Sequence, residues 1–561
     1  MKDPTIRSSS RGFLIRVDSP PDLVRLWPSH HWLRTAFLSP PPIQIAQLSS
    51  LDHKAKGNAC LAQSRPLDAL EHYSLALDAL DPATDPAPAL RATLLSNRAA
   101  VHLKLGSPGC ALRDCEAALG QAGVTDALRG KVLYRAGLAC YEMERYGAAA
   151  GHLDEVAELA PGDPAAGALY KRVASRMKEE LSGMYDWRAL YSQSVAGAAI
   201  DAASYVSPAA SVAEVEGKHR ALVATAPLEP GELLFVQRPL ASGRADKAGL
   251  SVVAGANLWT DSLDPPGVGH VVADLLERWV DREDQRDEIG RLWAGESKRW
   301  LNGCDGEAGV DVTRLEGIAT FNCFHPESLA DTASSDRDAE ADSNVYAPSA
   351  LYLLPSYMNH ACVGNVSYSF LGDVIFARAR LAIAPGDELV DSYVDGSDEL
   401  DARRPKLRKH GFVCACVLCA MDELDGLVRR RRRFELGEEV DQLADRVRQL
   451  PEASAARHIG TIRRLVGALE ECHHPTRSQL RPAVYPARRL LAQTLSDCGQ
   501  HAEAIAEEVE ALKALGAQFG GDDLAGLKLV AVPRAGDANA VLSALFVAKQ
   551  WNELGNNQAS G

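Results

Sequence analysis

Three cysteines stand within six residues, in the segment CACVLC from Cys414 to Cys419. Thiolates at this spacing suit a tetrahedral zinc ion, for which Cys414, Cys416 and Cys419 are one ligand short. Twelve cysteines in 561 residues are too few for a disulfide scaffold. The pattern therefore predicts a metal site in a reducing compartment.

Two further segments precede this motif, LLPSYMNHACVGNVSY and GDVIFARARLAIAPGDELVDSYVD. In order and spacing, the three segments resemble a SET domain, the fold of S-adenosylmethionine-dependent protein lysine methyltransferases. Asn359-His360-Ala361-Cys362 and Gly386-Asp387-Glu388-Leu389 up to Tyr393 match the two SET signatures. The cysteine motif matches the post-SET zinc segment. Short strand-like runs from about residue 212 to 239 resemble the opening strands of the same domain.

The resemblance implies a role for particular residues. Cys362 would be the fourth ligand of a zinc ion held with Cys414, Cys416 and Cys419. Tyr393 would be the catalytic residue, whose phenol positions the lysine amine for in-line methyl transfer and helps to exclude water. S-adenosylmethionine would be bound by six residues: Lys218, Arg220, Asn322, Asn359, His360 and Phe412.

Several residues depart from the SET pattern. His219 and Ala221 occupy the positions of a Gly-x-Gly turn that lets the backbone approach the cofactor, a role for which glycine is suited. His410 stands where tyrosine is common, and Ala361 and Gly364 are milder changes. A second hypothesis therefore stays open, in which the SET fold is a scaffold without activity and the chain is an adaptor.

The nearest layout is that of the SET-and-MYND methyltransferases, whose SET domain is split by a zinc module. Between residues 240 and 316 the only cysteine is Cys304, and a two-zinc module needs many more cysteine or histidine ligands, so MYND is expected to be absent. A helical insertion at about 241–315 takes its place. The chain resembles proteins in which repeats precede a SET domain.

Residues 51–184 show a helical period with an internal repeat. Small residues twelve apart recur three times, as Gly57 and Ala69, Ala99 and Ala111, and Gly137 and Ala149. Each pair is followed four residues later by a larger residue: Tyr73, Cys115 and Leu153. Small residues allow two helices to approach closely, and the larger residue fills the gap between them. The segments resemble tetratricopeptide repeats, which form an α-solenoid.

Five polar residues fall on the first helix of these pairs, which lines the concave face: Lys54, Asn58, Asn97, Lys131 and Arg135. Donors of this kind can grip a carboxylate through charge-assisted hydrogen bonds. The set resembles the carboxylate clamp of repeats that hold the acidic C-terminal tails of Hsp70 and Hsp90. An ordinary solvated helix face is the alternative.

Composition limits the remaining possibilities. An apolar content of 46% excludes a mostly disordered chain, and no window is apolar enough for a membrane span. A net charge of −15 argues against broad binding to nucleic acid. We expect a monomer whose partners are a protein substrate with a lysine side chain and, through the clamp, chaperone tails. We expect it in the cytoplasm, unless the arginine run 429–433 is a nuclear signal and not a solvated helix start.

The predicted fold class is multidomain, α and α+β. A disordered tail at 1–49 precedes the repeat domain at 50–182. A split SET domain follows at 183–420, with its post-SET zinc segment at 405–420. A helical region covers 421–555, and within it Cys472, His473 and His474 are interpreted as surface residues and not as a metal site.

Overall fold

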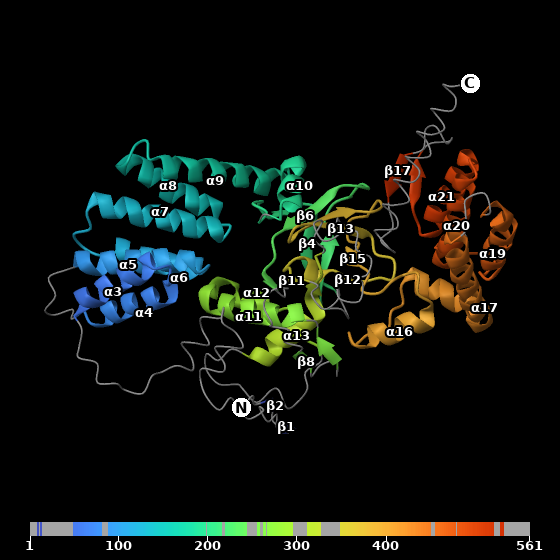
Figure 1. The fold of residues 1–561 in the computed structure, drawn as a ribbon, viewed down its shortest axis with the longest axis horizontal. Coiled ribbons are helices and arrows are strands. Elements are labelled where there is room, and N and C mark those ends of the chain that lie inside the picture. The colour runs from blue at the N-terminus through green and yellow to red at the C-terminus, as the bar shows by residue number, and fades with distance from the viewer. Residues whose placement is uncertain are drawn as a thin grey trace. The chain divides into compact units, whose positions relative to one another are not determined.

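The structure is a computed structural model of the chain (Figure 1). Most of the predicted tail, and Lys218, lie outside the residues that it describes. These are residues 8–9, 12–13, 49–80, 88–197, 199–215, 219–243, 255–257, 262–264, 266–295, 311–326, 348–449, 455–477, 480–520 and 528–531.

The chain forms two compact units. The first comprises Met1–Tyr205, Gln237–Leu353 and Phe370–Val374. The second comprises Val206–Val236, Leu354–Ser369 and Ile375–Gly561.

The N-terminal part of the first unit is a series of helices in which consecutive members pack together (Figure 1). Prolines begin four of them, because the fixed φ of proline suits the first helical turn, where its missing N–H is not needed. Ser49 and Asp52 form a capping box at the start of the series. The helices are α3 (Ser50–Ala62), α4 (Pro66–Asp78), α5 (Pro88–Lys104), α6 (Pro108–Leu119), α7 (Asp126–Glu142), α8 (Tyr146–Leu159), α9 (Pro164–Ser182) and α10 (Trp187–Val195).

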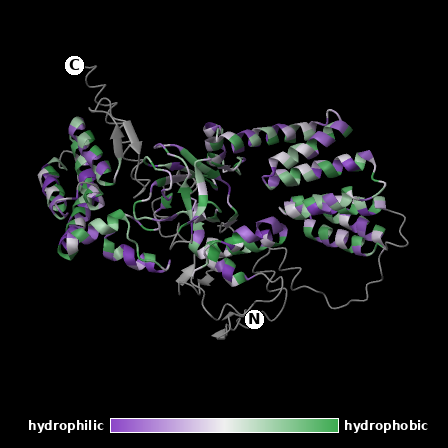
Figure 2. Cartoon of the chain, turned by 180° about the vertical axis from the view of Figure 1, so that it is seen from behind, coloured by the Kyte–Doolittle hydropathy of each residue, from purple (hydrophilic) through white to green (hydrophobic). Residues whose placement is uncertain are grey.

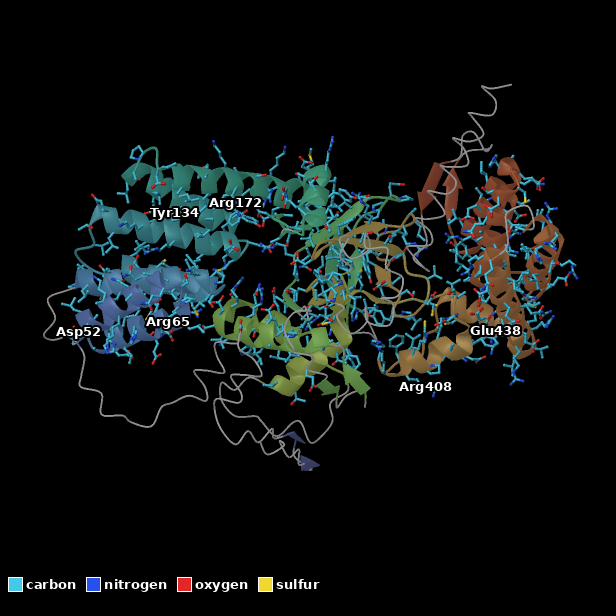
Figure 3. The ribbon with its side chains drawn as sticks, in the orientation of Figure 1. Asp52, Arg65, Tyr134, Arg172, Arg408 and Glu438 are labelled. Carbon is cyan, nitrogen blue, oxygen red and sulfur yellow. The ribbon has the colours of Figure 1, made fainter. Side chains whose placement is uncertain are left out.

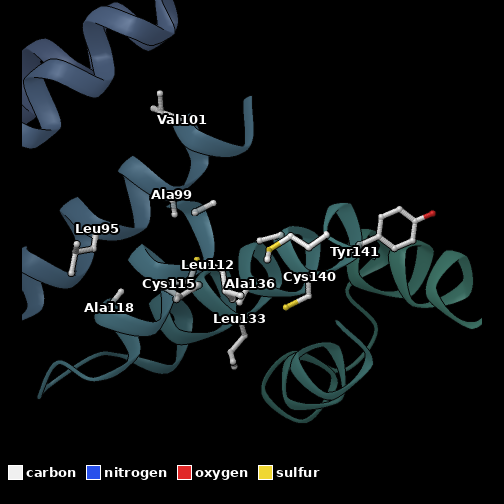
Figure 4. Close-up of a cluster of buried hydrophobic side chains, with 14 of the residues drawn as sticks. Leu95, Ala99, Val101, Leu112, Cys115, Ala118, Leu133, Ala136, Cys140 and Tyr141 are labelled. Carbon is white, nitrogen blue, oxygen red and sulfur yellow. The ribbon is translucent and has the colours of Figure 1, made fainter. Parts of the chain in front are cut away.

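The small residues of the repeat lie where paired helices touch. A Cβ atom added to Gly57 would lie 2.7 Å from Cε1 of Tyr73, and one added to Gly137 would lie 3.2 Å from Cγ of Leu153. Ala99 is fully buried in the same core, which Figure 4 shows between α5, α6 and α7. The larger residues thus fill the gap beside the small ones, as the sequence pattern predicted.

The rest of the first unit contains the insertion. Its helices are α11 (Pro266–Asp281), α12 (Arg286–Gly290) and α13 (Val312–Asn322). A three-stranded sheet has the order β10 (Cys323–Phe324), β11 (Ser349–Leu351) and β7 (Ala241–Gly243), and β8 (Gly255–Asn257) pairs with β9 (Ser262–Asp264). The described residues of the insertion are therefore mostly helical, with short strands.

The insertion docks onto the helical series at the start of α6. The backbone N–H groups of Gly109 and Cys110 donate to the carboxylate of Asp281, over 3.0 and 2.7 Å. Asp281 ends α11 and so satisfies two donors that the first turn of α6 leaves unpaired. Arg113 adds a bond to the backbone carbonyl of Asp281.

The second unit is built around short strands. β4 (Ala210–Val215) and β5 (His219–Ala224) form an antiparallel pair, and a four-stranded sheet has the order β13 (Val366–Leu371), β14 (Val374–Ala379), β6 (Leu233–Gln237) and β3 (Tyr205–Val206). β12 (Asn359–His360) pairs in parallel with β15 (Val390–Asp391). The strands predicted at 212–215, 221–224 and 233–236 are present.

Helices complete the second unit. α16 (Leu400–Arg408) precedes α17 (Val417–Arg448), which Gly426 interrupts with a φ of 76°. α19 (Ile459–Glu471), α20 (Tyr485–Asp497) and α21 (His501–Ala514) follow, each with one apolar side that packs into the core (Figure 2). The sequence predicted helix to the end of this region, but β16 (Gln518–Gly520) and β17 (Lys528–Ala531) form a strand pair. No helix among the described residues is long and apolar enough to cross a membrane.

Two interpretations of the C-terminal region are wrong. Cys472 and His473 are not surface residues, because both are buried. The arginine run is not simply a solvated helix start, because Arg430 and Arg433 are buried in ion pairs with Asp401, Glu399 and Asp425. Their burial removes two of the five charges that a nuclear signal would expose.

Candidate functional site

The parallel pair β12–β15 positions Asn359 and His360. Asn359 lies opposite Val390, and His360 lies opposite Asp391. Gly364 permits this approach, since an added Cβ would lie 2.6 Å from the carbonyl oxygen of Val390. The glycine at this position, which departs from the SET pattern, therefore fits the local packing.

Asn365 joins the same strands in a way that the sequence did not reveal. Its amide nitrogen donates to the carbonyl of Glu388 over 2.8 Å, and its amide oxygen accepts from the N–H of Val390 over 2.8 Å. The side chain thus replaces a missing strand partner. It follows the NHAC signature by three residues, and its polarity beside a strand was the signal that could have found it.

An aromatic cluster surrounds Tyr393. Its ring lies 5.2 Å from that of His360 and 4.9 Å from that of His410, measured between centroids. Phe412 lies 5.8 Å from His360 and 6.3 Å from His410. The structure therefore brings Tyr393, His360 and Phe412 together, and it adds His410.

The hydroxyl of Tyr393 donates a hydrogen bond to the carbonyl of Met358 over 2.7 Å. The residue as a whole is 38% exposed, so the hydroxyl end points inward while part of the ring faces solvent. Burial raises the pKa of Tyr393, with a smaller contribution from Asp391. The phenol is therefore protonated and neutral near pH 7.

His360 connects the aromatic cluster to the cysteines. Its Nδ1 accepts from the backbone N–H of Tyr393 over 3.0 Å, and its Nε2 lies 3.3 Å from Sγ of Cys362. A neutral ring that accepts at Nδ1 carries its proton on Nε2. That proton then points at the sulfur of Cys362.

His410 is neutral in this setting. Burial lowers the pKa of His410 to about 4, and the nearby charge of Lys409 acts in the same direction. The site thus gains a second imidazole without a positive charge at neutral pH.

Four cysteines lie close enough to share one ion. Sγ of Cys362 is 3.9 Å from that of Cys414 and 3.5 Å from that of Cys419, and the four ligand atoms, including that of Cys416, lie within 4.8 Å of one another. Bonds of 2.3 Å to a tetrahedral zinc ion would place the sulfurs about 3.8 Å apart. The cluster fits a metal ion bound by four thiolates.

The local fold favours thiolates in this cluster. Cys416 is the residue that caps the N-terminus of α17, and Cys419 lies in its first turn. Unpaired N–H groups and the helix dipole stabilise negative charge at this position. Hydrogen bonds within the cluster divide the four thiols: the bond from Cys362 lowers the pKa of Cys414 and that of Cys416, whereas the pKa of Cys362 and that of Cys419 are raised.

The remaining residues predicted to bind the cofactor lie in different surroundings. Arg220 is half-buried on β5, opposite Glu214. The amide nitrogen of Asn359 donates to Glu388 over 2.9 Å. Asn322 belongs to the first unit, where its amide nitrogen donates to the carbonyls of Trp293 and Ile318, each over 2.7 Å.

The five predicted clamp residues lie on α3, α5 and α7, the first helices of successive pairs. Asn58 accepts from the hydroxyl of Tyr73 over 2.7 Å, which leaves its amide nitrogen as the donor. Arg135 donates through Nη1 to the carbonyl and the hydroxyl of Ser96. Lys131 is exposed, and Lys54 and Asn97 are half-buried.

Sequence reasoning missed a buried ionic network beside the cysteines. Asp422 accepts from Arg403, Arg433 and Arg477, over 2.7, 3.2 and 2.7 Å. Arg433 also donates to Glu399 over 2.7 Å. Since the members are far apart in sequence, only the high density of arginine and aspartate after Cys419 could have indicated the network.

Relatives were found by comparison with known proteins. No family model matches the chain. A methyltransferase of Gibberella zeae is 26% identical over 478 residues, which cover 82% of this chain and 63% of that protein. The histone-lysine N-methyltransferase SET5 of Eremothecium gossypii is 40% identical over 70 residues, or 12% of this chain and 14% of that protein.

The N-lysine methyltransferase SMYD2 of Mus musculus is 31% identical over 101 residues, or 18% of this chain and 23% of that protein. The chain therefore spans less than two thirds of the length of each of these relatives, all of which are methyltransferases. Among solved structures, the Arabidopsis OM64 TPR domain matches this chain with 28% identity and a TM-score of 0.20. The match covers 22% of this chain and 94% of that domain.

Proposed function

We propose that the chain is an S-adenosylmethionine-dependent protein-lysine N-methyltransferase with a repeat domain for partner binding. The observation that carries the proposal is the convergence of His360, Tyr393 and Phe412 on one site beside the four cysteines. Methyltransferase relatives that include lysine methyltransferases support the same activity.

The residues present are chemically suited to the cofactor. The rings of His360, Tyr393 and Phe412 offer apolar faces for an adenine ring or a methyl sulfonium group. Neutral His410 adds no positive charge that would repel the sulfonium. When bound, S-adenosylmethionine supplies a methyl group on positively charged sulfur, which an amine can displace.

Tyr393 has the clearest role in this proposal. Its proton is engaged by the carbonyl of Met358, so its oxygen lone pairs are the groups left to accept from a lysine amine. Because the phenol stays protonated, it orients the amine and does not remove its proton. Positioning of this kind accounts for a large share of the rate in displacement reactions.

We assign the cysteine cluster to a structural zinc ion. The protein supplies all four positions of a tetrahedral site, which leaves none for water or substrate. Zinc there would hold the first turn of α17 against the segment that carries the NHAC signature.

The alternative is a non-catalytic adaptor. The observation in its favour is Asn322, whose amide nitrogen is already used by two backbone carbonyls of its own unit. Ala221, which stands in place of a glycine of the SET pattern, also favours the adaptor. In this reading the repeats bind acidic chaperone tails, and the SET fold is a scaffold.

Calorimetric titration with S-adenosylmethionine and with its demethylated product separates the two functions. We expect one saturable site for each compound, and transfer of radiolabelled methyl to lysine in a pool of candidate proteins. Absence of binding at millimolar ligand would overturn the methyltransferase proposal. Binding without transfer to any pool would favour the adaptor. We place both functions in the cytoplasm, with the nucleus as the alternative if the arginine run 429–433 acts as a nuclear signal.

A further inference from the structure

When the cysteine cluster binds a divalent ion, its four thiolates carry more negative charge than the ion neutralises. Four thiolates around a divalent ion carry a net charge of −2. Cys362 and Cys419 are 1% and 2% exposed, so water screens this charge poorly. Buried charge is tolerated when donors or cations of the protein compensate for it.

Arg403 on α16 is placed to provide such compensation. It is 1% exposed, and its Nη2 lies 3.8 Å from Sγ of Cys419. The same nitrogen donates to Asp422 over 2.7 Å, and Nη1 donates to the backbone carbonyl of Asp398. The planar guanidinium is thus held from two sides while it faces the sulfur.

The carboxylate that holds Arg403 is itself fixed. Asp422 lies one turn beyond Cys419 on α17, and it also accepts from Arg433 and Arg477. All three arginines are almost fully buried, which restricts their rotamers. Arg403 therefore cannot turn away from Cys419 without breaking bonds that the network makes.

We propose that Arg403 is a positioning residue of the metal centre, which donates to the sulfur of Cys419 and holds it in place within the cluster. The inference rests on the proposed zinc site. Partners that hydrogen-bond to metal ligands commonly change metal affinity by about 10- to 100-fold. Arginine suits the role because its donors diverge in one plane, whereas lysine offers a single point of charge.

The test compares full-length variants at one metal site. Arg403→Met keeps most of the side-chain length and removes charge and donors, and Arg403→Lys keeps the charge and one donor nitrogen but loses the planar, diverging donors. Arg408→Met is the matched control, because Arg408 is an exposed residue of the same helix (Figure 3). Metal affinity is measured by competition with a chelator. The thiolate-to-metal charge-transfer band is recorded after replacement of zinc by cobalt.

We expect Arg403→Met to bind metal about 10- to 100-fold more weakly and Arg403→Lys to be intermediate. The cobalt band should move to lower energy in Arg403→Met, since an unprotected thiolate gives up electron density more easily. Arg408→Met should match the wild type. A purely structural role would lower stability and leave the band in place.

Metal affinity of Arg403→Met within about twofold of Arg408→Met, with an unmoved band, would overturn the inference. If Arg403→Met does not fold, Arg403→Lys decides by the same two measurements. A wild-type chain that binds no cobalt or zinc would remove the proposed zinc site and this inference with it. Metal binding that is indifferent to Arg403 would remove only the inference.

Discussion

Tyr393 gives the most direct test at the scale of single residues. Tyr393→Phe removes the hydroxyl and keeps the ring that packs on His360 and His410. We expect cofactor binding near that of the wild type and turnover lower by roughly 10² or more, because the amine loses its acceptor. Calorimetry and single-turnover methyl transfer measure the two effects. Parallel losses of folding and activity would identify Tyr393 as a core residue.

Cys416 tests the metal centre. Cys416→Ser should bring the zinc content from one ion per chain to none, because serine is a poor zinc ligand at neutral pH. Structural zinc in small modules contributes on the order of 10 kcal/mol of apparent binding free energy, so the segment around α17 should also lose stability. Cys498→Ser at the end of α20 is the control and should keep its zinc. Elemental analysis of wild-type protein that shows no zinc would contradict the assignment.

His473 predicts a pH dependence of stability. Burial lowers the pKa of His473 to about 4, and the charges of Arg433 and Arg477 add to this. Neither ring nitrogen has a hydrogen-bond partner among the described residues. Since an unfolded histidine titrates near 6.5, the unfolded chain binds more protons between pH 4 and pH 6.5, and its population rises on acidification.

His473 therefore contributes about 3 kcal/mol to the free energy of unfolding above pH 6.5, and this contribution is lost as the pH falls towards 4. His473→Leu should remove this part of the acid sensitivity, and His458→Leu should not. Urea unfolding at pH 7.5 and at pH 5 measures the difference between variant and wild type, which cancels the acid effects of carboxylates and thiols. Equal pH slopes for His473→Leu and wild type would show that the imidazole is not held neutral.

Single residues also show what could be predicted from sequence. CxCxxC and NHAC are local patterns with a chemical meaning, and the structure brings all four cysteines together. His473 was misjudged because a histidine between Cys472 and His474 at a helix end gives no sign of the arginines near it. Asn365 and Arg403 were missed for the same reason, since their partners come from other segments.

At the scale of elements, the contact between α6 and α11 is open to a sharp test. A Cβ on Gly109 would lie 2.1 Å from the backbone oxygen of Asp281, and the backbone offers little freedom to move away. We expect Gly109→Ala to lower the free energy of unfolding of the first unit by about 1–3 kcal/mol. Gly151→Ala is the control, because this exposed helical glycine has nothing within 4 Å of an added Cβ.

Gly151→Ala should raise stability by about 0.5–1 kcal/mol, as expected for alanine in a helix. Urea denaturation followed by circular dichroism compares both variants with the wild type. If Gly109→Ala proved as benign as Gly151→Ala, the docking of α11 on α6 would not exist in solution.

The paired helices of the repeat region could be predicted from the sequence, because such pairs have a strong helical period and small residues at fixed offsets. The kink at Gly426 and the pair β16–β17 were not predicted. A glycine within a long polar helix carries no local sign of its φ, and the pairing of Gln518–Gly520 with Lys528–Ala531 depends on a contact between two separate segments. The Asp281 cap on α6 was also hidden, since it joins residues 172 positions apart.

At the scale of the whole molecule, net charge and local charge have opposite effects on the binding of an acidic chaperone tail. A chain with a net charge of −15 repels an acidic peptide at long range. Binding therefore requires a local group of donors strong enough to overcome that repulsion. Lys54 and Asn58 lie four residues apart on α3, and Lys131 and Arg135 are related in the same way on α7, so each pair shares one side of its helix.

The structure bears on how these donors are oriented. The hydroxyl of Tyr73 occupies the amide oxygen of Asn58, so the amide nitrogen is left to donate. Arg135 is tied to Ser96 of the neighbouring helix through Nη1, which fixes the direction of its guanidinium. Held side chains lose less entropy when a ligand binds.

We therefore expect the five clamp residues to bind a peptide that ends in aspartate, whose terminal and side-chain carboxylates offer two acceptors. Hydrogen bonds to charged groups contribute about 1.5–3 kcal/mol each, and several together give a Kd in the micromolar range, near −8 kcal/mol. Fluorescence polarisation with a labelled chaperone-tail peptide should show saturable binding that weakens with salt.

Lys131→Glu should abolish this binding, whereas Lys171→Glu on α9 makes the same change of net charge and should weaken it only slightly. Amidation of the peptide terminus should have the effect of Lys131→Glu. Binding that survives amidation would mean that these five residues form an ordinary solvated face.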